Sequence, residues 1–290
     1  MKLPPFDYQA PATLGEAVQI LSNGAGAAKA IAGGQSLIPI MAFRLANPSV
    51  LVDLGGIAGL NDIAIGEAGV SIGAMVRWRE LEDHAGLRSA CPLIPAAVGH
   101  IAHYQIRNRG TIGGSLAHAD PAAEMPGIAV TCDARIDIVG RTGTRKVDAQ
   151  DFFLGPLTTC LAHDEIITAI HFPPWPAARG WAFEEFSQRR GDFAFAGIAL
   201  YYDERPGGII ENAHVGVIGA TQIPRRLAAV EDTLDGKKFS DTIVALAATT
   251  ASSSVEPDDD IHASAAYRRA LVGTLVERSL ITAASRGRAS

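Results

Sequence analysis

The chain has 290 residues, of which 48% are hydrophobic and 19% charged, so it can build a sizeable core and is not expected to be disordered. Its 25 Lys and Arg against 31 Asp and Glu give a net charge of −6, which argues against a nucleic-acid-binding protein, because phosphate contacts need a clustered basic face. No apolar run reaches the roughly 20 residues of a membrane span, and the first residues lack the apolar core of a signal peptide. We therefore expect a soluble, cytoplasmic protein with no membrane span.

Three cysteines limit the metal chemistry of the chain. Cys91, Cys132 and Cys160 lie far apart in sequence, and none belongs to a C-x-x-C pair. A disulfide framework takes an even number of cysteines, and an iron–sulfur cluster normally takes four thiolates at tight spacing. We expect no metal site in this chain, so any cluster that works with it must be held by another chain.

The first part of the sequence alternates predicted helices and strands. Thr13 and Glu16 form a capping-box pattern ahead of an apolar helical stripe that ends near Asn23. Further predicted strands cover 28–32, 49–54, 70–73, 135–139 and 165–172, and further predicted helices cover 37–45 and 93–105. The four residues Pro173 to Pro176 (PPWP) interrupt any regular structure and mark a domain boundary.

Beyond this boundary the pattern changes from alternation to strands followed by helices. Predicted strands cover 181–186, 194–202 and 213–220, and predicted helices cover 224–234, 240–252 and 264–280. Strands followed by helices are typical of a small α+β domain.

Two similar glycine segments are the most informative feature of the sequence. The segments 32–37 (AGGQSL) and 112–116 (IGGSL) each carry two glycines and a hydroxyl, and Thr111 adds another hydroxyl. Glycines let backbone N–H groups converge on an anion, and a helix that starts there adds its own N–H groups. A tight turn is the simpler interpretation of either segment alone. The pair favours an anion site in which both loops grip one pyrophosphate.

The common nucleotide-binding fingerprints are missing. The segment 24–29 (GAGAAK) lacks the last glycine of G-x-G-x-x-G and precedes a strand instead of following one, and no G-x-x-x-x-G-K-[ST] occurs. The sequence therefore disfavours a Rossmann site and a P-loop.

The two loops belong to longer segments, 32–39 (AGGQSLIP) and 111–124 (TIGGSLAHADPAAE). These segments resemble the FAD-binding medium subunit of bacterial molybdenum hydroxylases, such as aerobic carbon monoxide dehydrogenase, xanthine dehydrogenase and quinoline oxidoreductase. The resemblance covers nearly the whole chain, from 1–8 (MKLPPFDY) through 190–194 (RGDFA) to 266–269 (AYRR).

This resemblance implies an α+β fold with two domains. Residues 1–176 would form a two-lobed α/β FAD-binding domain of the vanillyl-alcohol-oxidase (PCMH) type, with lobes at about 1–55 and 56–176. Residues 177–290 would form the C-terminal domain of the carbon monoxide dehydrogenase flavoprotein. The partners would be a large subunit with the molybdenum cofactor and a small subunit with two [2Fe–2S] clusters, in a heterotrimer or a dimer of heterotrimers. Electrons would pass from the clusters to FAD and then to an external acceptor.

The resemblance also implies roles for single residues. The two glycine loops would hold the pyrophosphate, Glu124 would accept hydrogen bonds from cofactor hydroxyls, and Phe193 would lie near the isoalloxazine ring. The expected cofactor contacts are Lys29, Ile31, Ala32, Gly33, Gly34, Gln35, Ser36, Leu37, Ile101, Thr111, Ile112, Gly113, Gly114, Ser115, His118, Asp120, Glu124, Ile167 and Phe193. No side chain of this chain is expected to be a catalytic acid or base.

Two positions depart from the family pattern. Relatives often carry lysine where Glu185 stands. If Glu185 faced inward, its acid would disfavour an anionic reduced flavin. The favoured interpretation is that Glu185 is a strand residue that faces the solvent. Tyrosine is frequent where Phe193 stands, which puts any hydroxyl-dependent gating in doubt.

Other candidates are weaker. His100 and His103 have no third metal ligand nearby, so a structural role is favoured, and the acidic run 258–260 is expected to be a solvated turn. Two other functions stay open. One is a stand-alone FAD-dependent oxidase or dehydrogenase, for which the sequence offers no convincing base. The other is a non-enzymatic binding module with two anion-gripping loops.

Overall fold

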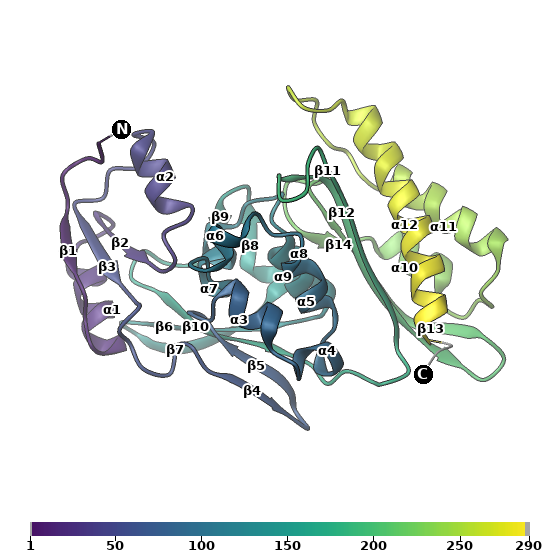
Figure 1. The fold of residues 1–290 in the computed structure, drawn as a ribbon, viewed down its shortest axis with the longest axis horizontal. Coiled ribbons are helices and arrows are strands. Elements are labelled where there is room, and N and C mark those ends of the chain that lie inside the picture. The colour runs from purple at the N-terminus through teal and green to yellow at the C-terminus, as the bar shows by residue number, and fades with distance from the viewer. Residues whose placement is uncertain (1, 288–290) are drawn as a thin grey trace.

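The computed structural model describes residues 2–287, whose strands form four sheets arranged in sequence order along the molecule (Figure 1). The N-terminal sheet is parallel, with strand order β1-β3-β2, and α1 packs on it through Ala17, Val18 and Leu21. Its elements are β1 (Asp7–Gln9), α1 (Leu14–Asn23), β2 (Ala28–Ile31), α2 (Leu37–Ala42) and β3 (Val50–Asp53). The predicted capping box of α1 is confirmed, because Thr13 and Glu16 each accept the backbone N–H of the other at 3.2 Å.

The central sheet is antiparallel, with strand order β4-β5-β10-β6-β7. Its strands are β4 (Ile63–Gly66), β5 (Gly69–Gly73), β6 (Arg135–Gly140), β7 (Gly143–Asp148) and β10 (Ile166–Phe172). The helices packed around it are α3 (Trp78–Asp83), α4 (Leu87–Ala90), α5 (Leu93–Val98), α6 (Tyr104–Arg107), α7 (Ile112–His118), α8 (Glu124–Thr131) and α9 (Ala149–Phe152). A two-stranded sheet of β8 (Phe153–Gly155) and β9 (Thr158–Thr159) lies beside them. The buried core joins Ile72, Ile136 and Ile170 of the strands to Ile94 and Ile128 of the helices.

The C-terminal sheet is formed by long antiparallel strands in the order β11-β12-β13-β14. These are β11 (Gly180–Ser187), β12 (Ala194–Arg205), β13 (Ile209–Ile218) and the short β14 (Arg225–Arg226). The helices α10 (Ala228–Leu234), α11 (Asp241–Ser253) and α12 (Ala265–Gly287) follow, and Figure 1 shows α12 lying along the outer face of this sheet. Among residues 2–287, no helix combines the length and apolarity that crossing a bilayer requires.

Both faces of the C-terminal sheet are buried. Ile198 and Leu200 of β12 join the core formed with α10, α11 and α12, whereas Ala199 and Tyr201 join the core of the central sheet. Successive side chains of a strand point to opposite faces, so this division follows from the alternation along β12. The helix α8 covers the inner face, where it contacts β12 and β13.

Four predicted helices differ from the observed ones. The helix predicted over 264–280 continues to Gly287 as α12. The helix predicted over 93–105 is two helices, α5 and α6, because Ala102 between them adopts a left-handed backbone with φ of 41°. The helix predicted over 224–234 begins only at α10, because Arg225 and Arg226 pair with β13 instead. The helix predicted over 37–45 ends at Ala42, shortly before Arg44 at φ of 64°.

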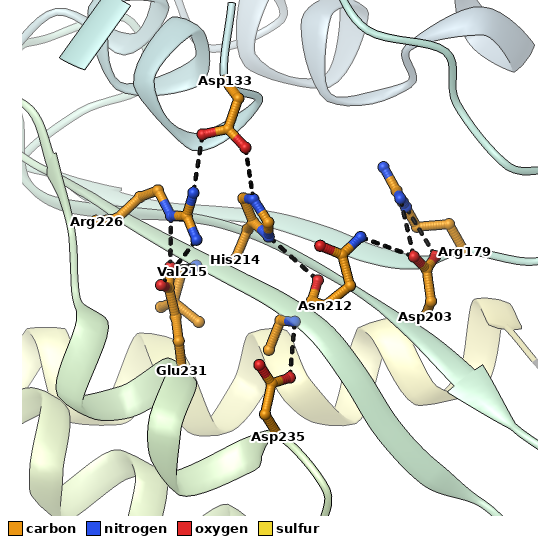
Figure 2. A network of polar contacts seen from close by, with 10 residues as sticks. Asp133, Arg179, Asp203, Asn212, His214, Val215, Arg226, Glu231 and Asp235 are labelled. Carbon is orange, nitrogen blue, oxygen red and sulfur yellow. Dashed lines mark hydrogen bonds and ion pairs between the residues drawn. The ribbon is translucent and has the colours of Figure 1, made fainter. Parts of the chain in front are cut away.

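A polar network ties α8 to the C-terminal sheet (Figure 2). Asp133, just after α8, lies 2.7 Å from His214 Nε2 and accepts a hydrogen bond from Arg226 at 2.8 Å. Arg226 also forms a two-bond ion pair with Glu231, which in turn accepts the N–H of Val215. Burial alone would raise the pKa of Asp133, but the hydrogen bonds and positive charges of His214 and Arg226 outweigh it, so this pKa lies below its usual value.

Asp133→Asn tests this network. We expect the variant to lose about 1–2 kcal/mol of unfolding free energy at neutral pH, because Arg226 and His214 lose their shared carboxylate. Asparagine tolerates the left-handed backbone of Asp133 (φ 49°), so strain would not account for the loss. Because the pKa is lowered by folding, the carboxylate stabilises the chain above the ordinary value of 3.8, and the difference between the two proteins should shrink as the pH falls below it.

Denaturant unfolding measures this difference, with Asp148→Asn as the control. Asp148 is about as exposed as Asp133, at 54% against 51%, but its partner Arg135, at 3.2 Å, is 60% exposed whereas His214 is 8% exposed, so this substitution should cost less than about 0.5 kcal/mol. Equal losses in the two variants would contradict a special role for Asp133.

Candidate functional site

A cavity of about 1340 Å³ lies where the three larger sheets meet. This volume exceeds the roughly 300–1,000 Å³ of common small-molecule pockets, so the cavity has room for a large ligand. Every expected contact residue except Ile112 lines it. The side chain of Ile112 is fully buried in the central core and its N–H donates to the carbonyl of Val76, so the structure places it behind the cavity wall.

The first glycine loop presents unpaired backbone donors to the cavity. The N–H groups of Gly33, Gly34, Gln35 and Ser36 have no acceptor within residues 2–287, although all four residues are half-buried. Partly buried backbone donors are normally paired, so a run of four free ones is typical of a nest that receives an anion. Gly34 makes this shape possible with its left-handed φ of 72°.

The second glycine segment, despite its similar sequence, uses its backbone differently. It is the first turn of α7, with Thr111 as the N-cap. The N–H groups of Gly113, Gly114 and Ser115 donate to Ala74, to the Thr111 hydroxyl and to the Thr111 carbonyl. This segment therefore offers the cavity the hydroxyl of Ser115 and a small surface, while the free N–H groups come from the first loop.

The two segments touch each other, which explains Gly33. A Cβ on Gly33 would lie 2.1 Å from the carbonyl oxygen of Arg109, just before the second segment, whereas a Cβ on Gly114 would make only an ordinary contact of 3.5 Å with the Cβ of Ala32. Gly33 therefore serves the close approach of the two segments as well as the opening to the cavity.

Glu124, the first residue of α8, is the buried acid of the cavity wall. Its side chain forms no hydrogen bond with another residue of the described chain, and the residue is 8% exposed. Burial raises the pKa of Glu124 to about 7, against the lowering effect of a hydrogen bond from its own backbone N–H, and the nearby charge of Asp120 acts in the same direction as burial. A buried carboxyl without a partner on another residue is suited to accept a hydroxyl from a ligand.

Glu185 faces inward, so the favoured interpretation of a solvent-facing residue is wrong. Its side chain is 1% exposed, its Oε1 lies 3.8 Å from Nδ1 of His100, and its Oε2 has no hydrogen-bond partner among the described residues. Burial, as the larger cause, and the charge of Glu124 together raise the pKa of Glu185 to about 8. The residue pattern of the strand did not predict this orientation, because both faces of β11 are covered by other elements.

The run 258–260 is also more than a solvated turn, because it contributes to the cavity rim. Asp260 accepts the N–H groups of His262 and Ala263 and binds Arg268 at 2.6 Å. The other end of the Arg268 guanidinium donates to the carbonyls of Phe195, at 2.7 Å, and Gly219, at 3.1 Å. Sequence reasoning missed Arg268, because no local pattern shows its two carbonyl partners, which lie 73 and 49 residues away.

Comparison with known proteins places this geometry in a class. A family model described as the FAD binding domain in molybdopterin dehydrogenase matches residues 4–175, and one described as the CO dehydrogenase flavoprotein C-terminal domain matches residues 181–283. The chain therefore belongs to the family of FAD-binding chains of molybdopterin dehydrogenases, and it is an oxidoreductase chain. The predicted family and fold class are confirmed.

Individual relatives align over almost the full length. The chain is 39% identical over 286 residues to the nicotine 6-hydroxylase medium subunit of Paenarthrobacter nicotinovorans, covering 99% of this chain and 100% of the relative. The solved carbon monoxide dehydrogenase of Hydrogenophaga pseudoflava that lacks the Mo-pyranopterin moiety has a chain with a TM-score of 0.95 and 36% identity, with 99% of each chain covered. Quinoline 2-oxidoreductase of Pseudomonas putida 86 has one with a TM-score of 0.94 and 36% identity, covering 99% of this chain and 100% of that one.

The residues of the cavity fit FAD. The nest of residues 33–36 suits a pyrophosphate, the partnerless carboxyl of Glu124 suits a hydroxyl, and Phe193, which is 68% exposed at the rim, suits an aromatic ring. Contact of each residue with the cofactor stays a prediction.

Gly34→Ala tests the nest. Alanine at φ of 72° costs about 1–2 kcal/mol and its Cβ would lie 3.3 Å from Cγ1 of Ile38, so we expect the loop to change shape. FAD should bind about tenfold more weakly, as equilibrium titration of flavin fluorescence would measure. Gly26→Ala is the matched control, because Gly26 has a similar φ of 90° but open space around it and lies outside the cavity. Unchanged FAD affinity in Gly34→Ala would remove the nest from the cofactor site.

Proposed function

We propose that this chain is the FAD-carrying electron-transfer subunit of a heteromeric molybdenum hydroxylase. It takes electrons from two [2Fe–2S] clusters on a small subunit and passes them to an external acceptor. A large subunit with the molybdenum cofactor hydroxylates the substrate. The observation that carries the proposal is the nest of four free N–H groups at the wall of a cavity large enough for a dinucleotide.

The residues of this chain bind and orient the cofactor. Bound FAD supplies the redox chemistry, accepting electrons one at a time and passing on two. The N–H groups of residues 33–36 hold the pyrophosphate, and Glu124 accepts a hydroxyl of the cofactor. Phe193 covers the ring at the open rim. No side chain of this chain acts as an acid or base on an organic substrate.

The other cofactors belong to partner subunits in this proposal. Three dispersed cysteines are too few for the four thiolates of a cluster, so the electrons must arrive from another chain. The names of two relatives contain nicotine and quinoline, both nitrogen heterocycles, and this supports a nitrogen heterocycle as the substrate of the large subunit.

The proposed domains are 1–176 and 177–290, with lobes at about 1–55 and 56–176 in the first. The family-model ranges 4–175 and 181–283 support this division. The tetrapeptide 173–176, which lies between β10 and β11, supports it too.

Mild affinity purification of the chain from its native host tests the function. We expect two co-purifying subunits, one cysteine-rich and one large, together with flavin, iron and molybdenum. A yellow, metal-free chain purified alone would contradict the proposal and favour an independent flavoenzyme. A colourless chain with all its partners would favour a binding module.

Phe193→Ala tests the position of the ring. We expect FAD to stay bound, because the nest and Glu124 are unchanged, while the rate of flavin reoxidation by dioxygen and by quinones changes about twofold or more as the ring loses its aromatic cover. Stopped-flow absorbance of the reduced flavin measures this rate. The control is Leu246→Ala, which shortens an exposed apolar side chain on α11 outside the cavity. Identical rates in the two variants and the wild type, with every acceptor, would remove Phe193 from the site.

A further inference from the structure

Two buried carboxyl groups, those of Glu124 and Glu185, lie close enough for the charge of the first to raise the pKa of the second. Glu124 lines the cavity, whereas Glu185, on β11, does not. Glu185 is opposite Gly197 of β12, and a Cβ on this glycine would lie 3.6 Å from Cγ of Glu185. On the side of β12, Glu185 is therefore enclosed by a residue that has no polar side chain.

Among the described residues, no lysine or arginine forms an ion pair with Glu185. The basic group within 4 Å of its carboxyl is His100, at 3.8 Å. The pKa of His100 lies below its usual value, first because of burial and second because of the charge of Arg190, so this ring is a weak counter-charge at neutral pH. The charged group of α8 that acts on Glu185 is Glu124, and the charge of Asp120 acts in turn on Glu124. Glu184, the neighbour of Glu185 on β11, acts on His100.

In these surroundings, Glu124 and Glu185 are not both ionised near neutral pH. A buried carboxylate without a cation is costly, and two of them together are costlier still, so the second carboxyl keeps its proton. Burial raises the pKa of both carboxyls, to about 7 for Glu124 and about 8 for Glu185, and only Glu124 lines the cavity, where an ionised group can be solvated. Near neutral pH these two carboxyls therefore carry at most one negative charge, which lies on the residue that faces the cavity.

We propose that Glu185 is a positioning residue that holds a proton at neutral pH and so keeps Glu124 as the single charge that receives the cofactor hydroxyl, and that ionisation of Glu185 weakens the binding of FAD. This inference rests on the proposed function and extends it. Glu124 would be covered and shielded from water by a cofactor bound in the cavity, and a second charge at Glu185 would then be still more costly. Binding then favours protonated Glu185, and the affinity must fall as the pH rises above 8.

Titration of the full chain, freed of FAD, with FAD at pH values from about 6 to about 9.5 tests the proposal. The wild type should bind FAD most tightly between the pH values at which Glu124 and Glu185 titrate, and about tenfold more weakly at the alkaline end of the range. Below pH 7 its affinity should also fall, because protonation of Glu124 removes the negative charge that strengthens its hydrogen bond from a cofactor hydroxyl. Glu185→Gln should lose the alkaline fall and keep the acidic one.

Glu184→Gln is the matched control. Glu184 is the preceding residue of the same strand and type, but it points to the other face of the sheet, where it pairs with Arg278 of α12 at 3.2 Å. This variant should reproduce both limbs of the wild-type profile. An alkaline fall in Glu185→Gln equal to that of the wild type, or a flat wild-type profile, would overturn the proposal.

Thermal unfolding of the FAD-free chain provides a second readout. Because folding raises the pKa of Glu185 from 4.5 to about 8, the folded chain binds more protons in this range, and its stability should fall as the pH rises through it. Glu185→Gln should show a shallower fall. A chain that bound no FAD at any pH would overturn the proposed function and this inference together. Tight, pH-independent binding of FAD would overturn the inference alone.

Discussion

The close packing of α8 against the C-terminal sheet is the constraint on which the site depends. A Cβ on Gly127 of α8 would lie 2.3 Å from Cγ1 of Ile218, and a Cβ on Gly216 of β13 would lie 1.8 Å from Oγ1 of Thr131. Helix and strand therefore approach more closely than any side chain would allow. This contact places Glu124, at one end of α8, in the cavity wall, and Asp133, just past the other end, within reach of His214 and Arg226.

The same contact closes the cavity from the side of the C-terminal sheet. Gly219, just after β13, donates its N–H to the carbonyl of Pro121, in the segment that leads into α8. Arg268 then joins the following rim to the sheet through the carbonyls of Phe195 and Gly219. The cavity is thus an interface between parts of the fold, which is where large cofactors commonly bind.

Polar groups of the fold divide into those that are paired inside the protein, away from the cavity, and those at the cavity wall that are left unpaired. The network of Asp133, Arg226 and Glu231 pairs its charges inside the protein and so holds the parts together. The N–H groups of residues 33–36 and the carboxyl of Glu124 lack such partners within the described chain. Leaving buried polar groups unpaired costs stability, and a ligand that pairs them recovers that cost on binding.

The sequence by itself determined the elements whose signals are local. The capping box of Thr13 and Glu16, the strand at 166–172 and the glycine segments at 32–37 and 112–116 depend on neighbouring residues, and the structure contains each of them. Every expected contact residue but Ile112 also reached one cavity, although their contact with FAD stays a prediction.

Tertiary structure decided what depends on distant partners. Two glycine segments of similar sequence differ in their free N–H groups because Thr111 and the distant Ala74 supply acceptors to the second, whereas no described residue supplies one to the first. Glu184 and Glu185 are equivalent acids in sequence, yet one pairs with Arg278 and the other is buried beside His100. The alternation of a strand defines two faces, but only the packing of α8 and α12 determines what each face meets.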